Sequence, residues 1–224
     1  MEQRKENLIE EFLRMKVLSF GERTLKSGRV SPYFFNIGRA DTALNMSSLA
    51  RSYAPLIYRD VDIIAGPAYK GIVLSYAVAL EFSKMFGRDV GWTYNRKEEK
   101  KGEGRWVGSE FENGFGISLL DDVITDGATK YEFVDMIKEV ADVDFKELVI
   151  AFNRQEVDAN GNDAVAQFKV KTGIEVKSIL TAGDLYDYTL ERKMNRERDA
   201  LIHYSQLYGT REFQGRVVSN FFYS

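Results

Sequence analysis

The most informative stretch of this 224-residue chain is Gly116-Ile-Ser-Leu-Leu-Asp121-Asp122-Val-Ile-Thr125-Asp126-Gly127-Ala128-Thr129. Its apolar first half predicts a buried strand that ends in two carboxylates, and the spacing after it predicts a helix over about 127–141. Two adjacent aspartates by themselves are often no more than a solvated strand end. Here, however, the acidic pair follows a strand and precedes a short loop and the beginning of a helix. This order indicates a ligand site at the carboxyl end of an open α/β sheet.

The chemistry of this stretch suits a sugar phosphate. Free backbone N–H groups at a helix start, together with the positive end of the helix dipole, favour a phosphate there. Ionised carboxylates only accept hydrogen bonds, so Asp121 and Asp122 suit sugar hydroxyls. We therefore predict that the acidic pair binds the sugar and that the backbone of 126–129 binds the phosphate.

Apolar runs alternate with helical patterns on both sides of this stretch. The runs predict strands over 62–65, 90–94, 116–120, 148–152 and 175–179. The helical patterns predict helices over 6–19, 46–58, 71–85, 127–141, 163–172, 182–190 and 193–208. Residues 20–36 predict extended chain around a turn at 26–29. This alternation predicts a mostly parallel central sheet flanked by helices, in a single domain without an internal repeat.

The composition limits the possible chemistry. Lys and Arg number 31 against 34 Asp and Glu, and this net charge of −3 argues against binding to nucleic acid or to an anionic membrane. The chain has no cysteine and a single histidine, His203, which we expect on a helix surface; thiol chemistry is excluded and a histidine triad is disfavoured. Without an apolar run long enough for a membrane span or a signal-peptide-like start, we expect a cytoplasmic protein.

A second candidate site is the loop Ala65-Gly66-Pro67-Ala68-Tyr69-Lys70-Gly71. It follows a predicted strand and carries a lysine where the next helix begins. Taken alone, it is equally consistent with an ordinary strand–helix turn. Because glycine lets the backbone approach a ligand closely and the ammonium adds charge, the loop also suits an anion.

A third candidate is the charged segment 95–109, which we call the lid. It contains three acidic residues, three glycines and five basic residues, namely Arg96, Lys97, Lys100, Lys101 and Arg105. A charge run is often only solvated surface, but this one shows no hydrophobic period and long loops in compact domains are often functional. We predict an irregular, glycine-hinged loop that closes over a polyanion.

The stretch at 121–129 resembles the phosphoribosyl pyrophosphate signature of the type I phosphoribosyltransferases, with Ala128 where a threonine is usual. Three further motifs are similar to those of the orotate phosphoribosyltransferase family: Phe20–Asn36, Asn95–Gly104 and Asn153–Glu156. The resemblance runs in register from about residue 12 to 190. One departure is Lys101, which stands where family members often carry a lid histidine, so we expect lower activity or a different pH profile.

The resemblance implies a fold and a reaction. The fold is type I phosphoribosyltransferase-like, with an N-terminal hood over residues 1–45, a core over about 46–190, and a C-terminal helix and tail over 191–224. The reaction converts orotate and phosphoribosyl pyrophosphate to orotidine 5′-monophosphate and diphosphate, in the synthesis of UMP. The resemblance also implies Mg²⁺ that arrives on the substrate's phosphates without direct protein ligands, a homodimer whose lid reaches the neighbouring site, and often a non-proline cis peptide in the 65–71 loop.

The same resemblance implies a role for each site residue. The ribose hydroxyls would meet Asp121 and Asp122. The 5′-phosphate would meet the loop and helix start, namely Asp126, Gly127, Ala128 and Thr129, with Thr125 near the base. Pyrophosphate would meet Tyr69 and Lys70 and the lid residues Arg96, Lys97 and Lys100. Orotate would meet Lys26, the backbone of Phe34 and Phe35, Thr125 and Arg154, the arginine as a two-pronged fork for the carboxylate.

Two alternatives remain open from the sequence. A type I transferase for another base would keep the acidic pair without needing Lys26 and Arg154 together. A non-catalytic regulator that binds the sugar phosphate would tolerate the changes at Lys101 and Ala128. The tail over 210–224 is unusually apolar, and we predict that it makes a core or subunit contact.

Overall fold

The computed structural model describes residues 2–102, 104–124 and 128–221, apart from the side chains of 99, 100, 220 and 221. Within these ranges the central sheet contains β3 Ile63–Gly66, β4 Gly91–Lys100, β5 Gly104–Gly108, β6 Gly116–Val123, β7 Asp144–Asn153 and β8 Glu175–Thr181. Their order across the sheet is β5-β4-β3-β6-β7-β8. All neighbours are parallel except β5, which pairs antiparallel with β4 at one edge. This sheet confirms the predicted α/β class.

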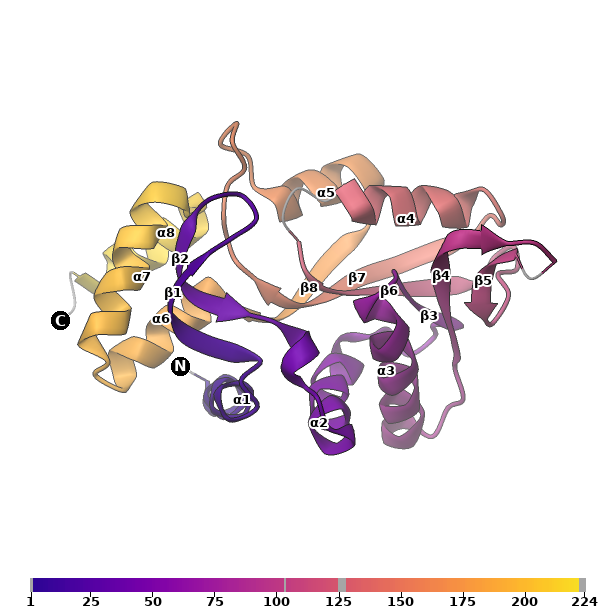
Figure 1. Ribbon diagram of the computed structural model, residues 1–224, viewed down its shortest axis with the longest axis horizontal. Coiled ribbons are helices and arrows are strands. Elements are labelled where there is room, and N and C mark those ends of the chain that lie inside the picture. Colours follow the sequence, from indigo (N-terminus) through magenta and orange to yellow (C-terminus); the bar gives the residue numbers. More distant parts are fainter. Residues whose placement is uncertain (1, 103, 125–127, 222–224) are drawn as a thin grey trace.

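Helices cover both faces of the sheet, as Figure 1 shows. One face carries α2 Ala43–Tyr53 and α3 Lys70–Phe86, and the other carries α4 Ala128–Lys138 and α5 Ala164–Thr172. The second face has its own apolar cluster, in which Phe133 of α4 and Phe168 of α5 are buried. Because both faces are covered, β6 and β7 are almost continuously buried, which explains why their sequences are apolar runs without alternation.

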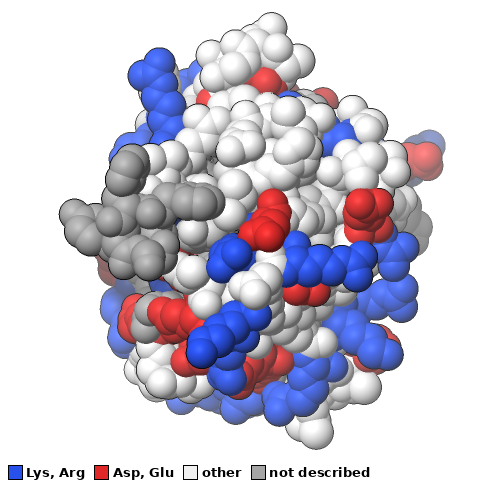
Figure 2. All heavy atoms as spheres, turned by 90° about the vertical axis from the view of Figure 1, so that its left-hand side faces the viewer, with Lys and Arg blue, Asp and Glu red and all other residues white. Residues whose placement is uncertain are grey.

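The two ends of the chain meet at one end of the molecule (Figure 1). The N-terminal elements there are α1 Gln3–Arg14, β1 Leu18–Thr24, β2 Val30–Phe35 and the 3-10 turn η1 Ile37–Arg39. The C-terminal elements are α6 Ala182–Glu191, α7 Asn195–Tyr208 and α8 Arg211–Phe221. β1 and β2 form an antiparallel hairpin, as the turn at 26–29 predicts. In the space-filling view of this end, basic and acidic side chains are interspersed over its lower half (Figure 2).

Helix α8 connects the tail to the core. Phe213 and Val217 are only 1% and 4% exposed and belong to the large apolar cluster that also contains the α1 and α6 side chains. The core contact predicted for the tail is therefore confirmed for these two residues, while 222–224 lie outside the described residues. The division into hood, core and tail stays a prediction.

Each predicted strand and helix has a counterpart, but some boundaries differ for local reasons. α1 ends at Arg14 rather than 19 because Lys16 adopts φ 60°, a left-handed conformation that stops a helix. α2 begins at Ala43 rather than 46 because the Thr42 hydroxyl caps the N–H of Asn45 at 3.2 Å. The chain then tightens into the 3-10 turn η2 Ala54–Leu56 at a proline.

The prediction of an irregular lid is wrong. β4 continues to Lys100 and β5 begins at Gly104, so the segment forms an antiparallel hairpin in which Asn95 pairs with Trp106. Lys97 and Glu98 on this extension are exposed, because the hairpin reaches beyond the helices that cover the sheet. A stretch of strand with charged, exposed side chains has no hydrophobic alternation, and this is why the sequence pattern did not reveal the hairpin.

Candidate active site

The acidic pair lies at the carboxyl end of β6, in the middle of the sheet between β3 and β7. Asp121 and Asp122 are each 8% exposed. The hydroxyl of Tyr53, from α2, donates to the carbonyl oxygen of Asp121 at 2.9 Å and so ties the strand end to the helix below it. The backbone N–H of Asp122 donates to the Asp121 carboxylate at 2.8 Å. Both carboxylates therefore stand on a rigid strand rather than on a loop.

Each carboxylate is paired with a lysine from a different helix. Lys130 in the first turn of α4 lies 2.7 Å from the Asp121 carboxylate, and Lys70 at the start of α3 forms an ion pair with Asp122. The pairs connect the two helices that flank β6, one on each face of the sheet. The structure thus brings Lys70 of the 65–71 loop directly to the acidic pair, from which it is 52 residues away in the sequence.

The two carboxyls differ in acidity. Burial raises the pKa of Asp121 above its usual range, even though the Lys130 ammonium opposes that shift. Burial acts on Asp122 in the same direction, but the hydrogen bond and the charge of Lys70 outweigh it and hold the pKa of Asp122 below its usual range. Asp122 is consequently the carboxylate that its lysine keeps ionised.

The 65–71 loop closes on itself through two glycines. A Cβ atom at position 66 would lie 2.6 Å from the carbonyl oxygen of Gly71, so glycine is needed for the end of β3 and the start of α3 to approach this closely. The Ala68–Tyr69 peptide between them is cis, as the family resemblance implies. The N–H of Ala68 donates to the Asn95 side chain of β4 at 2.9 Å. The loop is therefore held both by its own closure and by the strand that continues into the lid.

The loop and the lid line one open depression of about 410 Å³. Its walls are Ala68, Tyr69, Ile72, Tyr94, Asn95, Arg96, Lys97 and Glu98. The Lys97 ammonium lies 5.8 Å from the centre of the Tyr69 ring, and the Arg96 guanidinium reaches the carbonyl oxygen of Gly104 across the hairpin at 3.3 Å. Four residues predicted to bind pyrophosphate thus share one region, since Lys70 adjoins Tyr69. The Lys100 side chain lies outside those described.

The residues predicted for the 5′-phosphate are only partly described. Ala128 and Thr129 are the first two residues of α4, as the prediction of a helix start requires. Thr125, Asp126 and Gly127 lie outside the described residues. Their roles stay predictions.

The residues predicted for orotate come from the hairpin and from the segment after β7. The turn of the hairpin contains the exposed Lys26, and beside it Arg29 donates to the carbonyl oxygen of Val157 at 2.8 Å. Phe34 is partly exposed, whereas the Phe35 ring is buried against Phe152 with 5.1 Å between the ring centres. Phe35 can therefore meet a ligand only through its backbone, as the family resemblance also implies.

Arg154 differs from the free fork that we expected. It is 6% exposed, its Nε donates to the Glu156 carboxylate at 2.6 Å, and its Nη2 donates to the hydroxyls of Ser31 at 2.9 Å and Tyr204 at 3.3 Å. Its guanidinium also lies 4.5 Å from the centre of the Tyr33 ring. Because Nε and one terminal nitrogen are already engaged, a two-pronged contact with a carboxylate is not available in this arrangement.

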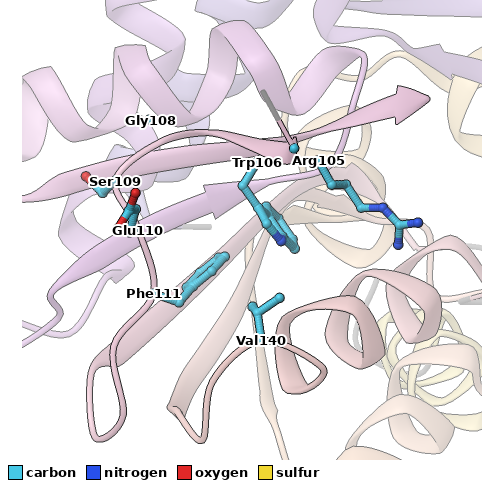
Figure 3. Close-up of a pocket in the computed structure, with 8 residues that line it drawn as sticks. Arg105, Trp106, Gly108, Ser109, Glu110, Phe111 and Val140 are labelled. Carbon is cyan, nitrogen blue, oxygen red and sulfur yellow. The ribbon is translucent and has the colours of Figure 1, made fainter. Parts of the chain in front are cut away.

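A second depression, of about 300 Å³, lies beside the lid strand β5 (Figure 3). Trp106, Phe111 and Val140 line it, and the Trp106 and Phe111 rings meet edge to face with 4.8 Å between their centres. Five of its lining residues belong to the lid segment 95–109, but none of the eight was predicted to bind phosphoribosyl pyrophosphate or orotate. It offers one basic and one acidic side chain, Arg105 and Glu110, so nothing in it matches the charge of a phosphate ligand.

The described residues contain no group of three histidine, cysteine or acidic side chains placed to hold a metal ion. Nor does any helix among them combine the length and the apolar character needed to cross a membrane.

Lys130 and Tyr53 are the residues of the site that the sequence reasoning missed. A signal for Lys130 does exist: a lysine in the first turn of a helix faces the positive end of the dipole, so it needs a specific acidic partner. Tyr53 gives no such signal, because a buried tyrosine in an amphipathic helix looks like ordinary core.

The mostly parallel sheet has an acidic pair at the end of a central strand. A glycine loop with a lysine lies beside that pair, and a basic hairpin adjoins the loop. This arrangement is that of a type I phosphoribosyltransferase. No family model matches the chain. The crystal structure of orotate phosphoribosyltransferase from Francisella tularensis superposes with a TM-score of 0.81 at 34% identity, over 91% of this chain and 100% of that one.

Two curated relatives carry the same name. Orotate phosphoribosyltransferase from Clostridium acetobutylicum is 34% identical over 224 residues, which cover 94% of this chain and all of the relative. The protein of that name from Schizosaccharomyces pombe is 40% identical over 208 residues, which cover 90% of this chain and 96% of the relative. The chain therefore belongs to the orotate phosphoribosyltransferase family and is a pentosyltransferase.

Proposed function

We propose that this chain transfers the phosphoribosyl group of phosphoribosyl pyrophosphate to orotate, forming orotidine 5′-monophosphate and diphosphate in pyrimidine biosynthesis. The observation that carries the proposal is the direct contact of Lys70, from the 65–71 loop, with Asp122 of the acidic pair. That contact joins a group suited to pyrophosphate with a group suited to the ribose. The anomeric carbon, whose bond to diphosphate breaks as its bond to the base nitrogen forms, would lie between them.

The chemistry needs positioning and electrostatics more than covalent catalysis. As diphosphate leaves, positive charge develops on the ribose ring, and the carboxylates of Asp121 and Asp122 favour it. Lys70, Arg96 and Lys97 carry the positive charge that a departing diphosphate requires. A closed lid would also exclude water, which competes with orotate for the ring.

Lys70 and Lys130 balance the negative charge of the acidic pair. Without them, two adjacent buried carboxylates would repel each other and would be costly to keep ionised. When the substrate binds, its hydroxyls compete for the same carboxylate oxygens and its phosphates offer Lys70 a new partner. We infer that Lys70 exchanges Asp122 for the diphosphate, while Lys130, more buried in α4, stays with Asp121.

Mg²⁺ fits this site as a companion of the substrate. Carboxylate oxygens such as those of Asp121 and Asp122 are ligands that the ion accepts, but each carboxylate already bonds to a lysine. We therefore assign the ion to the phosphates of phosphoribosyl pyrophosphate. When bound there, it neutralises the charge that accumulates on the leaving diphosphate.

We also propose a homodimer in which the lid reaches the neighbouring site. Four apolar side chains follow one another at helical spacing along α3 and its N-terminal edge and are 40 to 74% exposed, namely Tyr69, Val73, Tyr76 and Leu80. Such a stripe is unusual on a monomer surface and suits an interface. Since Tyr69 also belongs to the 65–71 loop, a second copy packed on the stripe would stand next to the pyrophosphate site.

The absence of cysteine fits a reducing compartment, and we propose the cytoplasm as the location of this protein.

The decisive experiment follows the loss of orotate absorbance in the presence of Mg²⁺ and phosphoribosyl pyrophosphate. We expect turnover with orotate and none with adenine, hypoxanthine or uracil, assayed by product chromatography. Asp122→Asn should lower kcat/KM for phosphoribosyl pyrophosphate by about 100-fold, because it removes a charge next to the reacting carbon. Glu175→Gln, which alters an exposed ion pair on β8, is the matched control and should leave the rate unchanged.

Two outcomes would contradict the proposal. Turnover of another base without orotate would make the chain a transferase of different specificity. Binding of phosphoribosyl pyrophosphate without turnover of any base would make it a regulator.

A further inference from the structure

The segment after β7, residues 154–157, is held from two directions by parts of the chain that are far away in sequence. From the hairpin, Arg29 donates to the Glu156 carboxylate at 3.4 Å and to the Val157 carbonyl oxygen at 2.8 Å. From the C-terminal side, the Val157 N–H donates to the carbonyl oxygen of Tyr208 at 2.9 Å. The predicted orotate arginine, Arg154, thus lies in a segment whose backbone depends on helix α7.

Glu156 of that segment and Tyr204 of α7 form a closed set of hydrogen bonds with Arg154. The Glu156 carboxylate accepts from Arg154 Nε at 2.6 Å and from the Tyr204 hydroxyl at 2.9 Å, and the same hydroxyl accepts from Arg154 Nη2 at 3.3 Å. Burial, reinforced by the Glu156 charge, raises the pKa of Tyr204 to about 12. The hydroxyl therefore keeps its proton at neutral pH and can serve as donor and acceptor at once.

The backbone between Arg154 and Glu156 is equally constrained. Gln155 adopts φ 49°, a left-handed conformation that is unfavourable for a side chain other than glycine. Three hydrogen bonds, each 2.8 Å long, hold it: its N–H donates to Asn153 Oδ1, its carbonyl oxygen accepts from Thr210, and its side-chain oxygen accepts from the N–H of Gly183.

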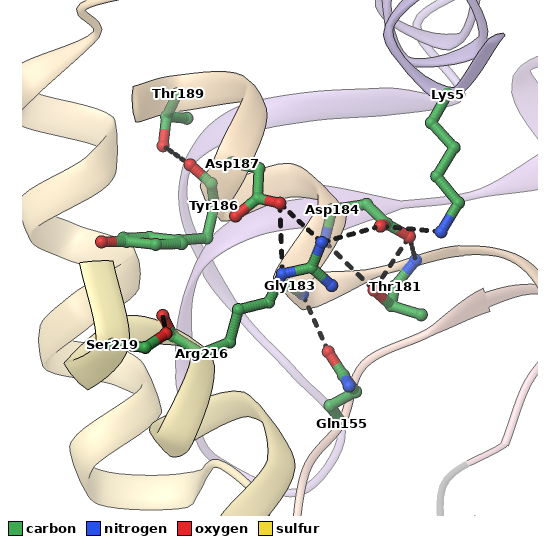
Figure 4. Close-up of polar contacts among 10 residues, drawn as sticks. All are labelled: Lys5, Gln155, Thr181, Gly183, Asp184, Tyr186, Asp187, Thr189, Arg216 and Ser219. Atoms are coloured by element: carbon green, nitrogen blue, oxygen red, sulfur yellow. Dashed lines mark hydrogen bonds and ion pairs between the residues drawn. The ribbon is translucent and has the colours of Figure 1, made fainter. Parts of the chain in front are cut away.

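Helix α8 supports this arrangement from behind. Figure 4 shows Gln155 reaching Gly183, beside which Arg216 extends from α8 to the carboxylates of α6. Arg216 Nε donates to Asp187 at 3.1 Å, and its Nη2 lies 3.5 Å from Asp184. A side chain at Gly183 would meet the Arg216 Cδ atom at 2.8 Å, so α8 packs closely against the turn that binds Gln155.

From this network we infer that Glu156 and Tyr204 are positioning residues for base recognition: they orient the Arg154 guanidinium and leave its Nη1 as the nitrogen offered to orotate. The inference rests on the proposed function. Nε and Nη2 are occupied, and Nη1 makes no hydrogen bond to any residue within the described ranges. Orotate then accepts a hydrogen bond from one fixed nitrogen of Arg154 rather than from two nitrogens of a mobile guanidinium. A fixed donor loses less conformational freedom when the base binds.

The test compares two identical substitutions one turn apart on α7. Tyr204→Phe removes the hydroxyl that bonds Glu156 and Arg154 but keeps the ring. Tyr208→Phe is the control, because the Tyr208 ring packs on Arg29 while its hydroxyl bonds to none of the described residues. We expect Tyr204→Phe to raise the KM for orotate about five- to tenfold, the effect of losing one buried hydrogen bond. Its kcat and its KM for phosphoribosyl pyrophosphate should stay within about twofold, and the control should match wild type.

Glu156→Gln is the second variant and is measured in the same way, with the melting temperature of each protein recorded. It keeps an oxygen for Tyr204 but removes the charge that holds Arg154 and Arg29, so the KM for orotate should rise further than in Tyr204→Phe. An unchanged KM for orotate in both variants would overturn the inference, as would an equal loss for both substrates. If the wild-type protein itself fails to convert orotate, the proposed function is at fault, and the two failures are thereby distinguished.

Discussion

Gly66→Ala should lower the catalytic efficiency of this chain strongly while leaving it folded. The added Cβ would lie 2.6 Å from the Gly71 carbonyl oxygen and 2.8 Å from its Cα, whereas ordinary van der Waals contact begins at 3.4 Å. Both neighbouring atoms belong to the backbone, so no side chain can turn away. The start of α3, which carries Lys70, must therefore move by roughly 0.8 Å relative to β3.

This displacement has two calculable consequences. A shift of about 1 Å in a substrate-positioning group costs about 100-fold in rate, so we expect kcat/KM for phosphoribosyl pyrophosphate to fall by roughly 30- to 100-fold. Overpacking at one site costs about 1–3 kcal/mol in the free energy of unfolding, and for a chain of this size that lowers the melting temperature by about 2–12 °C. The variant should remain folded under assay conditions.

The assay measures initial rates from orotate absorbance while each substrate is varied, together with thermal unfolding. Gly215→Ala is the control, since a Cβ at that position of α8 meets no atom within 4 Å and alanine favours a helix. It should keep full activity and gain a little stability. Wild-type kinetics for Gly66→Ala, combined with the expected loss of stability, would refute the idea that loop closure positions Lys70.

Three further predictions address charge. Lys130→Met removes the cation that opposes the effect of burial on Asp121, so the pKa of Asp121 should rise further. The acid limb of the kcat/KM profile for phosphoribosyl pyrophosphate should then move to higher pH. An acid limb at the wild-type pH would contradict this pairing. Lys177→Met leaves the fully buried Glu147 carboxylate without the ammonium group that lies 3.1 Å away. The free energy of unfolding, measured with denaturant, should fall by about 3–5 kcal/mol. Adding Glu147→Gln to this variant should restore part of that free energy. Lys100→Ala should lower kcat far more than it weakens orotate binding, and equal losses would show that Lys100 does not serve the leaving group.

The order of elements was readable because it depends on local patterns. β6 and most of β7 are buried, so their sequences contain short apolar runs, and α4 and α5 on one face of the sheet each bury apolar side chains at helical spacing. The acidic pair could be found for the same reason, since two charged residues at the end of an apolar strand interrupt the pattern. Where the side chains of a strand are charged and exposed, as at Lys97 and Glu98 of the lid, the pattern disappears, and there the prediction was wrong.

The partners of the site residues could not be read in this way. Asp122 meets Lys70 across 52 residues, Arg154 meets Tyr204 across 50, and the same arginine meets Ser31 across 123. The hydrophobic periodicity of the sequence does not predict such contacts, because they depend on how helices and hairpins pack across the sheet.

The amino-acid sequence was enough to predict an α/β sheet with a sugar-phosphate motif at the end of one strand, and its motifs indicated the family. Hydrophobic period, glycine positions and residue spacing are local quantities, and they suffice for those conclusions. Three features became known from the three-dimensional structure alone: Lys130 and Lys70 balance the acidic pair, the lid is a hairpin, and Arg154 is held by Glu156 and Tyr204. Those features follow from side chains that meet after distant segments pack together, and the cost of burying a charge or a hydrogen-bonding group determines which of them pair.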